Sequence, residues 1–543
     1  MNREPSGSWM DALRPHRPEA WAALAAVLLS WRTVAFRSPD LLLDDAFISF
    51  RYAANLVAGH GLVFNPGERV EGYTNFLWTV LLAACRWLGL DIPAMSVGLA
   101  FVFTLGTLVL LLALARQLLA GAPGWIVAAP ALLFGVSAAT TRYVHSGMET
   151  ALFVFLITLG LFLAVDRRRR PFATGVAFAF ATMTRPEGAL YFGLVFVAAL
   201  LARPEPGSPG ARRRLDTAAA LAGGFLIFYT PYFLWRFSYY GYLLPNTFYV
   251  KVAGSGSHLA TRGLSHLRAI VRIASLEAPL LLALGALPAV GRDRRWRLLG
   301  AVVLATLIYF VAIGGDFLFF FGPRFLMPAL PALLLLDAEA LRALAVSPAR
   351  RPYRALLGAA VLAALLVNAA WLSWPARFDQ LRDVSLLNRS WTEVGRWLRR
   401  NSPPGSLVAV GAAGRIPYYS RLRALDILGL TDLHIAHLDV PLGDGFPGHE
   451  KSDPSYVLSR KPDYIVFARL DAQGRPLMGN WDRVLPELEE TYEMVALAKA
   501  SESPGPWILP ADAYSDDLGR RGYRGAIFRR RTLPAPNDPE SGR

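Results

Sequence analysis

The sequence predicts a polytopic α-helical membrane protein, with about eleven transmembrane helices and a C-terminal extracytoplasmic α/β domain. Of the 543 residues, 54% are hydrophobic and only 18% are charged, and the mean hydropathy is +0.34. Soluble domains carry about 25% charged residues. The apolar residues gather in runs of about 20, the length that crosses a bilayer. These runs end near residue 374, beyond which acidic residues and turn signals become frequent.

Eleven apolar runs are expected to span the lipid bilayer, the first as an uncleaved anchor with the N-terminus inside. A further run, residues 75–90, is short and contains Arg86, Trp78 and Trp87. We expect it to lie along the outer interface instead of crossing. The expected spans lie near residues 20–36, 94–116, 124–140, 149–166, 171–184, 187–202, 215–235, 270–290, 298–314, 323–343 and 354–374.

The net charge of +15 comes almost wholly from arginine, since only four of the 56 basic residues are lysines. Four arginine clusters, at residues 167–170, 212–214, 292–297 and 350–354, fall on the cytoplasmic side of this topology. That distribution obeys the positive-inside rule. The basic charge therefore reflects topology, and nucleic acid is not an expected partner. The expected location is a cytoplasmic (inner) membrane.

Residues 1–374 are thus predicted to form a transmembrane domain, and residues 375–543 an α/β domain outside the cytoplasm. Apolar runs at residues 406–410 and 464–467 predict buried strands. The residues that follow the first strand, 411–414, lack the full glycine fingerprint of a dinucleotide loop, so an ordinary strand-to-turn junction is favoured. The single cysteine excludes an internal disulfide and has no neighbouring cluster that would form a structural zinc site.

Two adjacent aspartates, Asp44 and Asp45, directly follow the first expected span. A helix over residues 44–58 would place Asp44 and Arg51 on one face, with Asn55 one turn further along. One aspartate at a helix start is commonly an N-cap. Two adjacent aspartates at membrane depth favour a function, because only one of them can cap the helix and ionisable groups there are costly.

Glycosyl transfer is a reaction that needs such a carboxylate, which takes the proton of an acceptor hydroxyl. We expect Asp44 to be this base, because Arg51 could hold it ionised, and Asp45 to orient a hydroxyl or a metal. With a polyprenyl phosphate donor, basic side chains would neutralise the departing phosphate. Lys251 is the only lysine before residue 451 and lies beside two aromatic residues. The basic candidates are Arg142, His145, Arg185, Lys251 and Arg324.

Several of these polar residues also have a plainer interpretation. Arg142 could snorkel at a helix end, and Arg185 could pair with Glu187 across the intervening proline. Asp316 could cap the next helix or orient an arginine. His60, between two glycines, is more typical of a turn than of a ligand.

Seven motifs lie in order between residues 44 and 316: DDAFISFRY at 44–52, GHGLVFNPG at 59–67, VEGYTN at 70–75, SGMET at 146–150, TRPEG at 184–188, PNT at 245–247 and GGD at 314–316. In these motifs the chain resembles the GT-C class of integral-membrane glycosyltransferases. It most closely resembles the bacterial arabinofuranosyltransferases that add terminal arabinofuranose units in mycobacterial cell walls.

The resemblance implies a polyprenyl phosphate sugar donor, with an arabinofuranose-like sugar, and a cell-envelope glycan, lipid or protein as acceptor on the outer face. It also implies a catalytic aspartate in the first outer loop. Some members bind a divalent cation near the acidic pair, so a divalent cation stays open and no metal ligand is assigned. The expected roles are catalysis for Asp44 and Asp45, donor binding for Arg51, His60, Arg142, His145, Arg185, Lys251 and Arg324, and substrate positioning for Asn55, Glu71, Asn75, Glu149, Glu187, Asn246 and Asp316.

Two other classes of function compete with the enzyme. A polytopic lipid or sugar transporter would show inverted repeats and polar residues distributed through its spans. The unusual polar residues of this chain concentrate on the outer side instead, which favours the enzyme. A non-catalytic scaffold for envelope assembly, which binds through the outer domain, is the third class.

Overall fold

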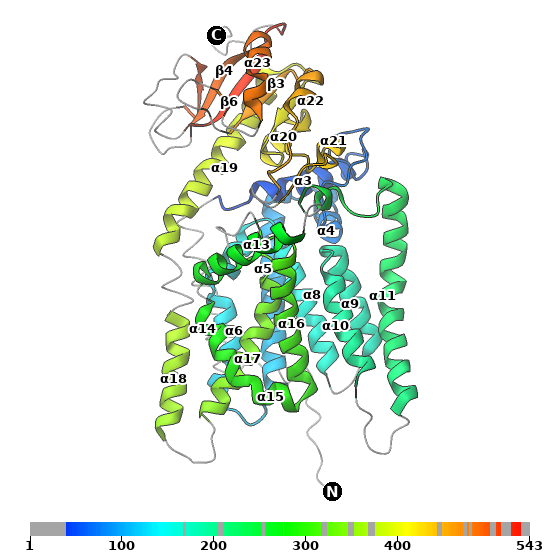
Figure 1. Ribbon diagram of the computed structural model, residues 1–543, viewed down its shortest axis with the longest axis vertical. Coiled ribbons are helices and arrows are strands. Elements are labelled where there is room, and N and C mark those ends of the chain that lie inside the picture. Colours follow the sequence, from blue (N-terminus) through cyan, green and yellow to red (C-terminus); the bar gives the residue numbers. More distant parts are fainter. Residues whose placement is uncertain are drawn as a thin grey trace.

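The computed structural model shows a bundle of apolar helices with a mixed β-sheet region above it (Figure 1). The first expected span, near residues 20–36, lies outside the described residues. The structure describes residues 40–166, 170–202, 210–251, 256–274, 276–316, 323–345, 352–367, 375–442, 448–468, 470, 475–476, 480–499, 506–511 and 523–533.

The helices of the bundle begin and end close to the expected runs, because apolar stretches are interrupted by caps and prolines. α5, for example, begins after Asp91, whose side chain accepts a hydrogen bond from the Ala94 amide at 3.0 Å, with a proline in its first turn. The bundle contains α5 (Ile92–Leu118), α6 (Gly124–Val136), α8 (Thr150–Val165), α9 (Pro171–Thr184), α10 (Gly188–Leu200), α11 (Gly210–Tyr240), α13 (Gly256–Ile273), α14 (Glu277–Ala283), η1 (Leu284–Ala286), α15 (Leu287–Arg292), α16 (Arg294–Ala312), η3 (Met327–Ala329), α17 (Leu330–Ala345) and α18 (Pro352–Val367).

Within the described residues, three helices are individually long and apolar enough to cross a membrane. They are α5, the Arg212–Tyr240 part of α11, and α16. Two bent pairs would each qualify as one broken span: α6 with α7 (Ala138–His145), at 49°, and the helices over residues 258–272 and 277–292. The run expected as one span near 270–290 is divided between the end of α13 and the helices over residues 277–292, with a bend of 96° between them. The total of eleven spans stays a prediction.

Four short helices lie at the upper end of the bundle, beneath the sheet region: α3 (Asp44–Val57), α4 (Phe76–Trp87), α7 and α12 (Asn246–Lys251). α3 confirms the helix expected over residues 44–58 and packs on α4. α4 covers most of the run expected at the outer interface. Its C-terminal end is exposed, with Trp87 77% accessible.

The C-terminal region begins with α19 (Pro375–Asn401) and forms a six-stranded sheet in the order β2-β1-β3-β6-β4-β5. β1 pairs in parallel with β2 and β3, and the other pairs are antiparallel. The two strands expected from the sequence are confirmed as β1 and β3. The elements are β1 (Leu407–Val410), α20 (Arg415–Ser420), β2 (Arg423–Asp426), α21 (Leu433–Ala436), α22 (Pro454–Ser459), β3 (Tyr464–Phe467), η5 (Trp481–Val484), α23 (Leu485–Thr491), β4 (Tyr492–Lys499), β5 (Ile508–Pro510) and β6 (Tyr523–Arg530).

Buried polar contacts join the sheet region to residues 40–75, the segment that contains α3. Arg51 on α3 donates to the carbonyl oxygens of Pro417 at 2.5 Å and Leu422 at 2.7 Å. Asn65 donates to the Ala424 carbonyl at 2.8 Å. α19 begins where the sequence predicted the second domain to start, but these contacts fix the sheet region against α3. The division into two domains stays a prediction.

Candidate active site

A cavity of about 200 Å³ lies beneath the sheet region, where α3 and α12 meet the ends of the bundle helices. Its apolar wall includes Ile48, Tyr73, Met148, Phe248, Tyr309, Phe325 and Leu430. Its polar wall brings together side chains from segments far apart in the sequence. They are Asp45, Ser49, Asn75, Glu149, Arg185, Glu187, Lys251, Asp316 and Arg324.

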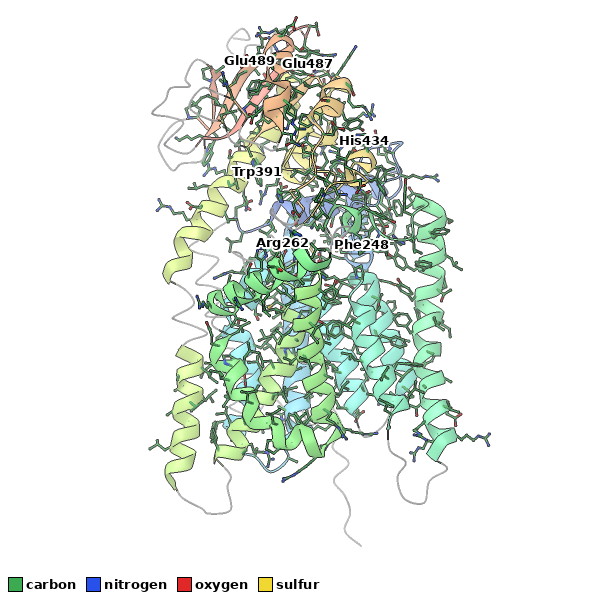
Figure 2. All side chains as sticks on the ribbon, viewed as in Figure 1. Phe248, Arg262, Trp391, His434, Glu487 and Glu489 are labelled. Atoms are coloured by element: carbon green, nitrogen blue, oxygen red, sulfur yellow. The ribbon has the colours of Figure 1, made fainter. Side chains whose placement is uncertain are left out.

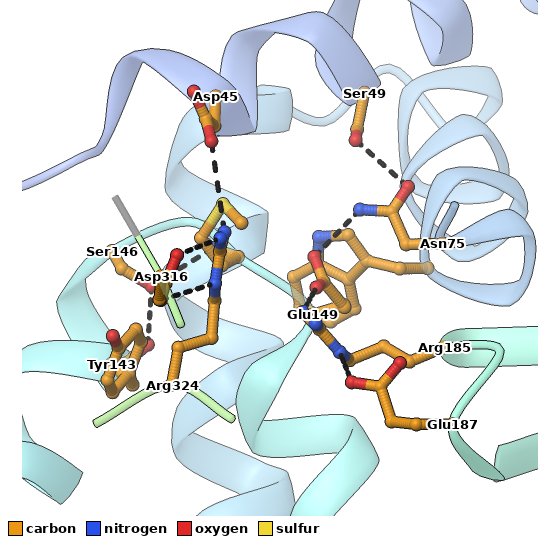
Figure 3. A network of polar contacts seen from close by, with 12 residues as sticks. Asp45, Ser49, Asn75, Tyr143, Ser146, Glu149, Arg185, Glu187, Asp316 and Arg324 are labelled. Carbon is orange, nitrogen blue, oxygen red and sulfur yellow. Dashed lines mark hydrogen bonds and ion pairs between the residues drawn. The ribbon is translucent and has the colours of Figure 1, made fainter. Parts of the chain in front are cut away.

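Asp45 is the carboxylate that α3 presents to this cavity. Its Oδ2 lies 3.8 Å from Nη1 of Arg324, and its side chain is 35% exposed. Arg324 is held from the other side by Asp316, which accepts from Nε at 3.2 Å and from Nη2 at 2.7 Å (Figure 3). The two-pronged contact fixes the plane of the guanidinium and leaves Nη1 directed at Asp45.

A second series of hydrogen-bonded side chains lines the cavity from α3 to the turn between α9 and α10. Ser49 donates to Oδ1 of Asn75 at 3.0 Å, and Asn75 donates to Glu149 at 2.8 Å. Arg185 donates through Nη1 to Glu149 at 2.6 Å and through Nε to Glu187 at 2.5 Å (Figure 3). The pairing of Arg185 with Glu187 confirms the plainer interpretation, yet both residues also line the cavity. Nη2 of Arg185 takes no part in either of these hydrogen bonds.

Lys251 ends α12 and differs from the two arginines. Within the described residues, no hydrogen bond or ion pair engages its ammonium group. Burial lowers the pKa of Lys251, while the nearby Asp45 opposes that effect. A half-buried cation without a partner among the described residues is costly, so an anionic ligand would stabilise it.

Phe325 lies between the two cavity arginines. The guanidinium carbon of Arg185 is 4.6 Å from the centroid of its ring, and that of Arg324 is 5.1 Å away. The ring thus separates the two cations and holds both by cation–π contact.

The expected division of roles between the aspartates is not what the structure shows. Asp44 faces the sheet region and does not line the cavity: its carboxylate accepts from the amides of Gly414 at 3.0 Å and Arg415 at 2.7 Å. Arg51 does not contact Asp44 and donates instead to carbonyls of the sheet region and, at 2.6 Å, to the Phe64 carbonyl. Successive helical residues point about 100° apart, and the tertiary contacts turn Asp45 toward the cavity.

Besides Arg51, three residues expected to bind the donor lie outside the cavity. His60 is exposed in the loop after α3. Arg142 and His145 belong to α7 and do not line the cavity, and Arg142 is fully buried. The donor-binding candidates that the structure brings together are therefore Arg185, Lys251 and Arg324.

Three residues expected to position substrate stabilise the surrounding loops instead. Asn55 donates to the Val63 and Phe64 carbonyls. Asn246 donates to the carbonyls of Gly429 and Leu430, at 2.8 and 3.1 Å, and so holds the segment before α21 against α12. Glu71 forms a buried ion pair at 2.6 Å with Arg236 of α11.

Arg236 and Arg262 are buried polar residues near the site that the sequence analysis did not identify. Arg236 lies within an aromatic run, where a single arginine was the available signal. Arg262 of α13 pairs with Glu450 at 2.8 Å and donates to the Gly314 carbonyl at 2.9 Å, two residues before Asp316. Figure 2 shows Arg262 and Phe248 between the bundle and the sheet region.

The cavity carboxylates are engaged by arginine and do not form a ready cation site. Glu149 and Glu187 pair with Arg185, and Asp316 pairs with Arg324. Among the described residues, no group of three or more His, Cys, Asp or Glu side chains could hold a metal ion. Because these carboxylates are paired with arginine, the chemistry below is derived without a divalent cation.

Comparison with known sequences identifies named relatives. The chain is 32% identical over 285 residues to the terminal β-(1→2)-arabinofuranosyltransferase of Mycobacterium tuberculosis. This match covers 49% of this chain and 43% of the relative. It is 28% identical over 342 residues to the enzyme of that name from Corynebacterium glutamicum, covering 54% and 47%. The matches span less than half of each relative. Residues 379–517 match a family model described as a domain of unknown function (DUF8728).

Solved structures show the same fold. ArnT from Cupriavidus metallidurans bound to undecaprenyl phosphate has a TM-score of 0.56 at 15% identity, covering 94% of this chain and 98% of ArnT. This chain has the ArnT fold. The mycobacterial arabinofuranosyltransferase AftD has a TM-score of 0.50 at 18% identity, covering 94% of this chain and 40% of AftD. The resemblance to GT-C glycosyltransferases, and to arabinofuranosyltransferases by name, is thus confirmed.

Proposed function

We propose that this protein is a membrane glycosyltransferase that transfers a sugar from a polyprenyl phosphate to an acceptor hydroxyl. The observation that carries the proposal is the cavity itself. It brings Asp45, the cavity carboxylate that is not hydrogen-bonded to Arg185 or Arg324, together with the basic side chains of Arg185, Lys251 and Arg324 in a partly apolar enclosure. That arrangement offers a proton acceptor for one substrate and an anion site for the other.

Asp45 would act as the general base. As the acceptor oxygen forms its bond to the anomeric carbon, its proton passes to the Asp45 carboxylate, and the bond from that carbon to the phosphate oxygen breaks. The polyprenyl phosphate leaves with the electron pair of that bond. The exposure of Asp45 to the cavity supports this assignment over Asp44, whose oxygens are occupied by backbone amides.

The basic side chains would bind the phosphate and stabilise its growing charge. Among the described residues nothing bonds the Lys251 ammonium group. Nη2 of Arg185 and Nη1 of Arg324 take no part in the hydrogen bonds to Glu149, Glu187 and Asp316. Fixed donors of this kind act strongly in a water-poor cavity. Phe325 and Phe248 add apolar surface beside them.

The named relatives support an arabinofuranose-like sugar, and ArnT with its bound undecaprenyl phosphate supports a polyprenyl phosphate carrier. The acceptor class is a glycan, lipid or protein of the cell envelope. We place the protein in the bacterial cytoplasmic membrane, with the N-terminus inside and the sheet region outside. The starts of α11 and α16, which carry the arginine clusters at residues 212–214 and 292–297, lie at the end of the bundle away from the sheet region (Figure 1) and support that orientation.

The test is incubation of the purified protein in detergent with a panel of radiolabelled polyprenyl phosphate sugars and envelope acceptors. Asp45→Asn should lower turnover by about 10² to 10⁴-fold with little change in donor affinity. Asp91→Asn is the matched control, because Asp91 is an exposed helix cap and asparagine also caps. Failure to consume any donor would contradict the proposal, and label that crosses liposomes without transfer would favour a transporter.

A further inference from the structure

Asp44 holds the start of α3 against the sheet region through two backbone amides. Its Oδ2 accepts from Gly414 at 3.0 Å and its Oδ1 accepts from Arg415 at 2.7 Å. The two partners are some 370 residues away in sequence. Leu43, the residue before α3, makes no side-chain cap, so the role of Asp44 is tertiary. Charged acceptors make the stronger class of hydrogen bond.

Gly414 permits this contact because it has no side chain. A Cβ atom at residue 414 would lie 1.8 Å from the Asp44 carbonyl oxygen and 2.8 Å from its carboxylate carbon. The backbone of Gly414, at φ −91°, is not in the left-handed region, so the requirement is one of space alone. Gly414, which follows β1, thus serves close packing on α3.

Arg415 strengthens the same junction from the other side. Its guanidinium donates to both carboxylate oxygens of Asp40, at 3.0 and 2.6 Å, and to the Leu42 carbonyl at 2.7 Å. It also lies 4.3 Å over the ring of Phe47. The side chain is 1% exposed. The chain just before α3 and its first turn are therefore both bound to the loop after β1, a strand in the interior of the sheet.

We infer that Asp44 is a positioning residue, which locks the loop after β1 onto α3 and thereby fixes the neighbouring Asp45 in the cavity. The inference rests on the proposed function, because Asp45 is the base there. Asp44 and Asp45 are consecutive in one helix, so a tilt of α3 moves both. A base must lie within about 3 Å of the hydroxyl it deprotonates, and a misplacement of about 1 Å can cost 10²-fold in rate.

The experiment compares turnover and donor KM in the full-length protein for Asp44→Asn, Gly414→Ala, Asp45→Asn and the double variant Asp44→Asn/Asp45→Asn. The control is Arg423→Ala. It removes an exposed ion pair with Glu68, which also joins the sheet region to residues 40–75. We expect a 10- to 100-fold fall in kcat for Asp44→Asn and for Gly414→Ala. Donor KM should stay within twofold, and the control should match the wild type.

The double variant separates positioning from a general loss of folded protein. If Asp44 acts only through Asp45, the double variant is no slower than Asp45→Asn alone, because residues that act as a unit are non-additive. Hydrogen exchange of the peptide covering residues 40–50 should rise in Gly414→Ala and not in the control. Additive losses, or normal turnover in both Asp44→Asn and Gly414→Ala, overturn the inference while Asp45→Asn still supports the transferase. A wild-type protein without transfer overturns both.

Discussion

Lys251 provides the sharpest test of the donor site, since it is the cavity cation without a carboxylate partner among the described residues. Replacing it with methionine keeps an unbranched side chain, one heavy atom shorter, and removes the charge. A hydrogen bond to a charged group contributes about 1.5–3 kcal/mol. At 1.36 kcal/mol for each factor of ten, that loss corresponds to about 10- to 150-fold in kcat/KM for the donor.

The thermal stability of the ligand-free protein should not fall with donor use in Lys251→Met. Because burial lowers the pKa of Lys251, the charged form is disfavoured by folding, and Lys251→Met should leave the thermal stability unchanged or raise it. Weaker donor use with undiminished thermal stability is the result expected for a cation that binds a ligand. Replacing a lysine with a structural role would lower both donor use and thermal stability.

The assay is initial rates over a range of polyprenyl phosphate sugar concentrations, with melting temperatures measured on the same preparations. Lys461→Met is the matched control, because Lys461 is an exposed lysine in the sheet region. An unchanged kcat/KM in Lys251→Met would refute the assignment of the phosphate to this end of the cavity. A large fall in melting temperature would refute the argument that the ammonium is unpaired in the free protein.

Three further outcomes are expected. Chelation with EDTA should leave transfer unchanged, because the cavity carboxylates are paired with arginine; lost activity that Mg²⁺ or Mn²⁺ restores would contradict this. Burial raises the pKa of Asp44 to about 6, so turnover should fall as the pH drops through 6 in the wild type but not in Asp44→Asn. Protonation of Asp44 favours the folded state, since its folded pKa exceeds the unfolded value, so the loss below pH 6 is not unfolding. A reporter fused after residue 375 should be extracytoplasmic, and a cytoplasmic reporter would contradict the topology.

The sequence predicted the local elements well, because they depend on local patterns. α9 occupies the expected residues 171–184, and α3 ends one residue before its expected limit. The division of the run near 270–290 was not predicted, because α13 carries an arginine-rich amphipathic pattern up to Ile273 and the apolar run alone did not reveal the break.

The sequence predicted several residues of the site but not how their side chains are arranged. Asp45, Arg185, Lys251 and Arg324 could be chosen from residue type and position. The orientation of α3 could not be predicted, because it depends on Gly414, about 370 residues away, which occupies the carboxylate of Asp44. A helical pattern places two adjacent aspartates on different faces but does not say which face meets the cavity.

The position of Arg324 indicates why the general base and the anion site would share one small cavity. Under the proposed reaction, Asp45 loses its negative charge when it takes the acceptor proton, while the departing phosphate gains one. The total charge of the cavity is unchanged, and only its location shifts. Arg324 contacts Asp45 at 3.8 Å and is fixed by Asp316, so its guanidinium can interact with the charge at either end without moving. Such preorganisation stabilises the transition state, because no reorientation of dipoles is needed as the charge moves.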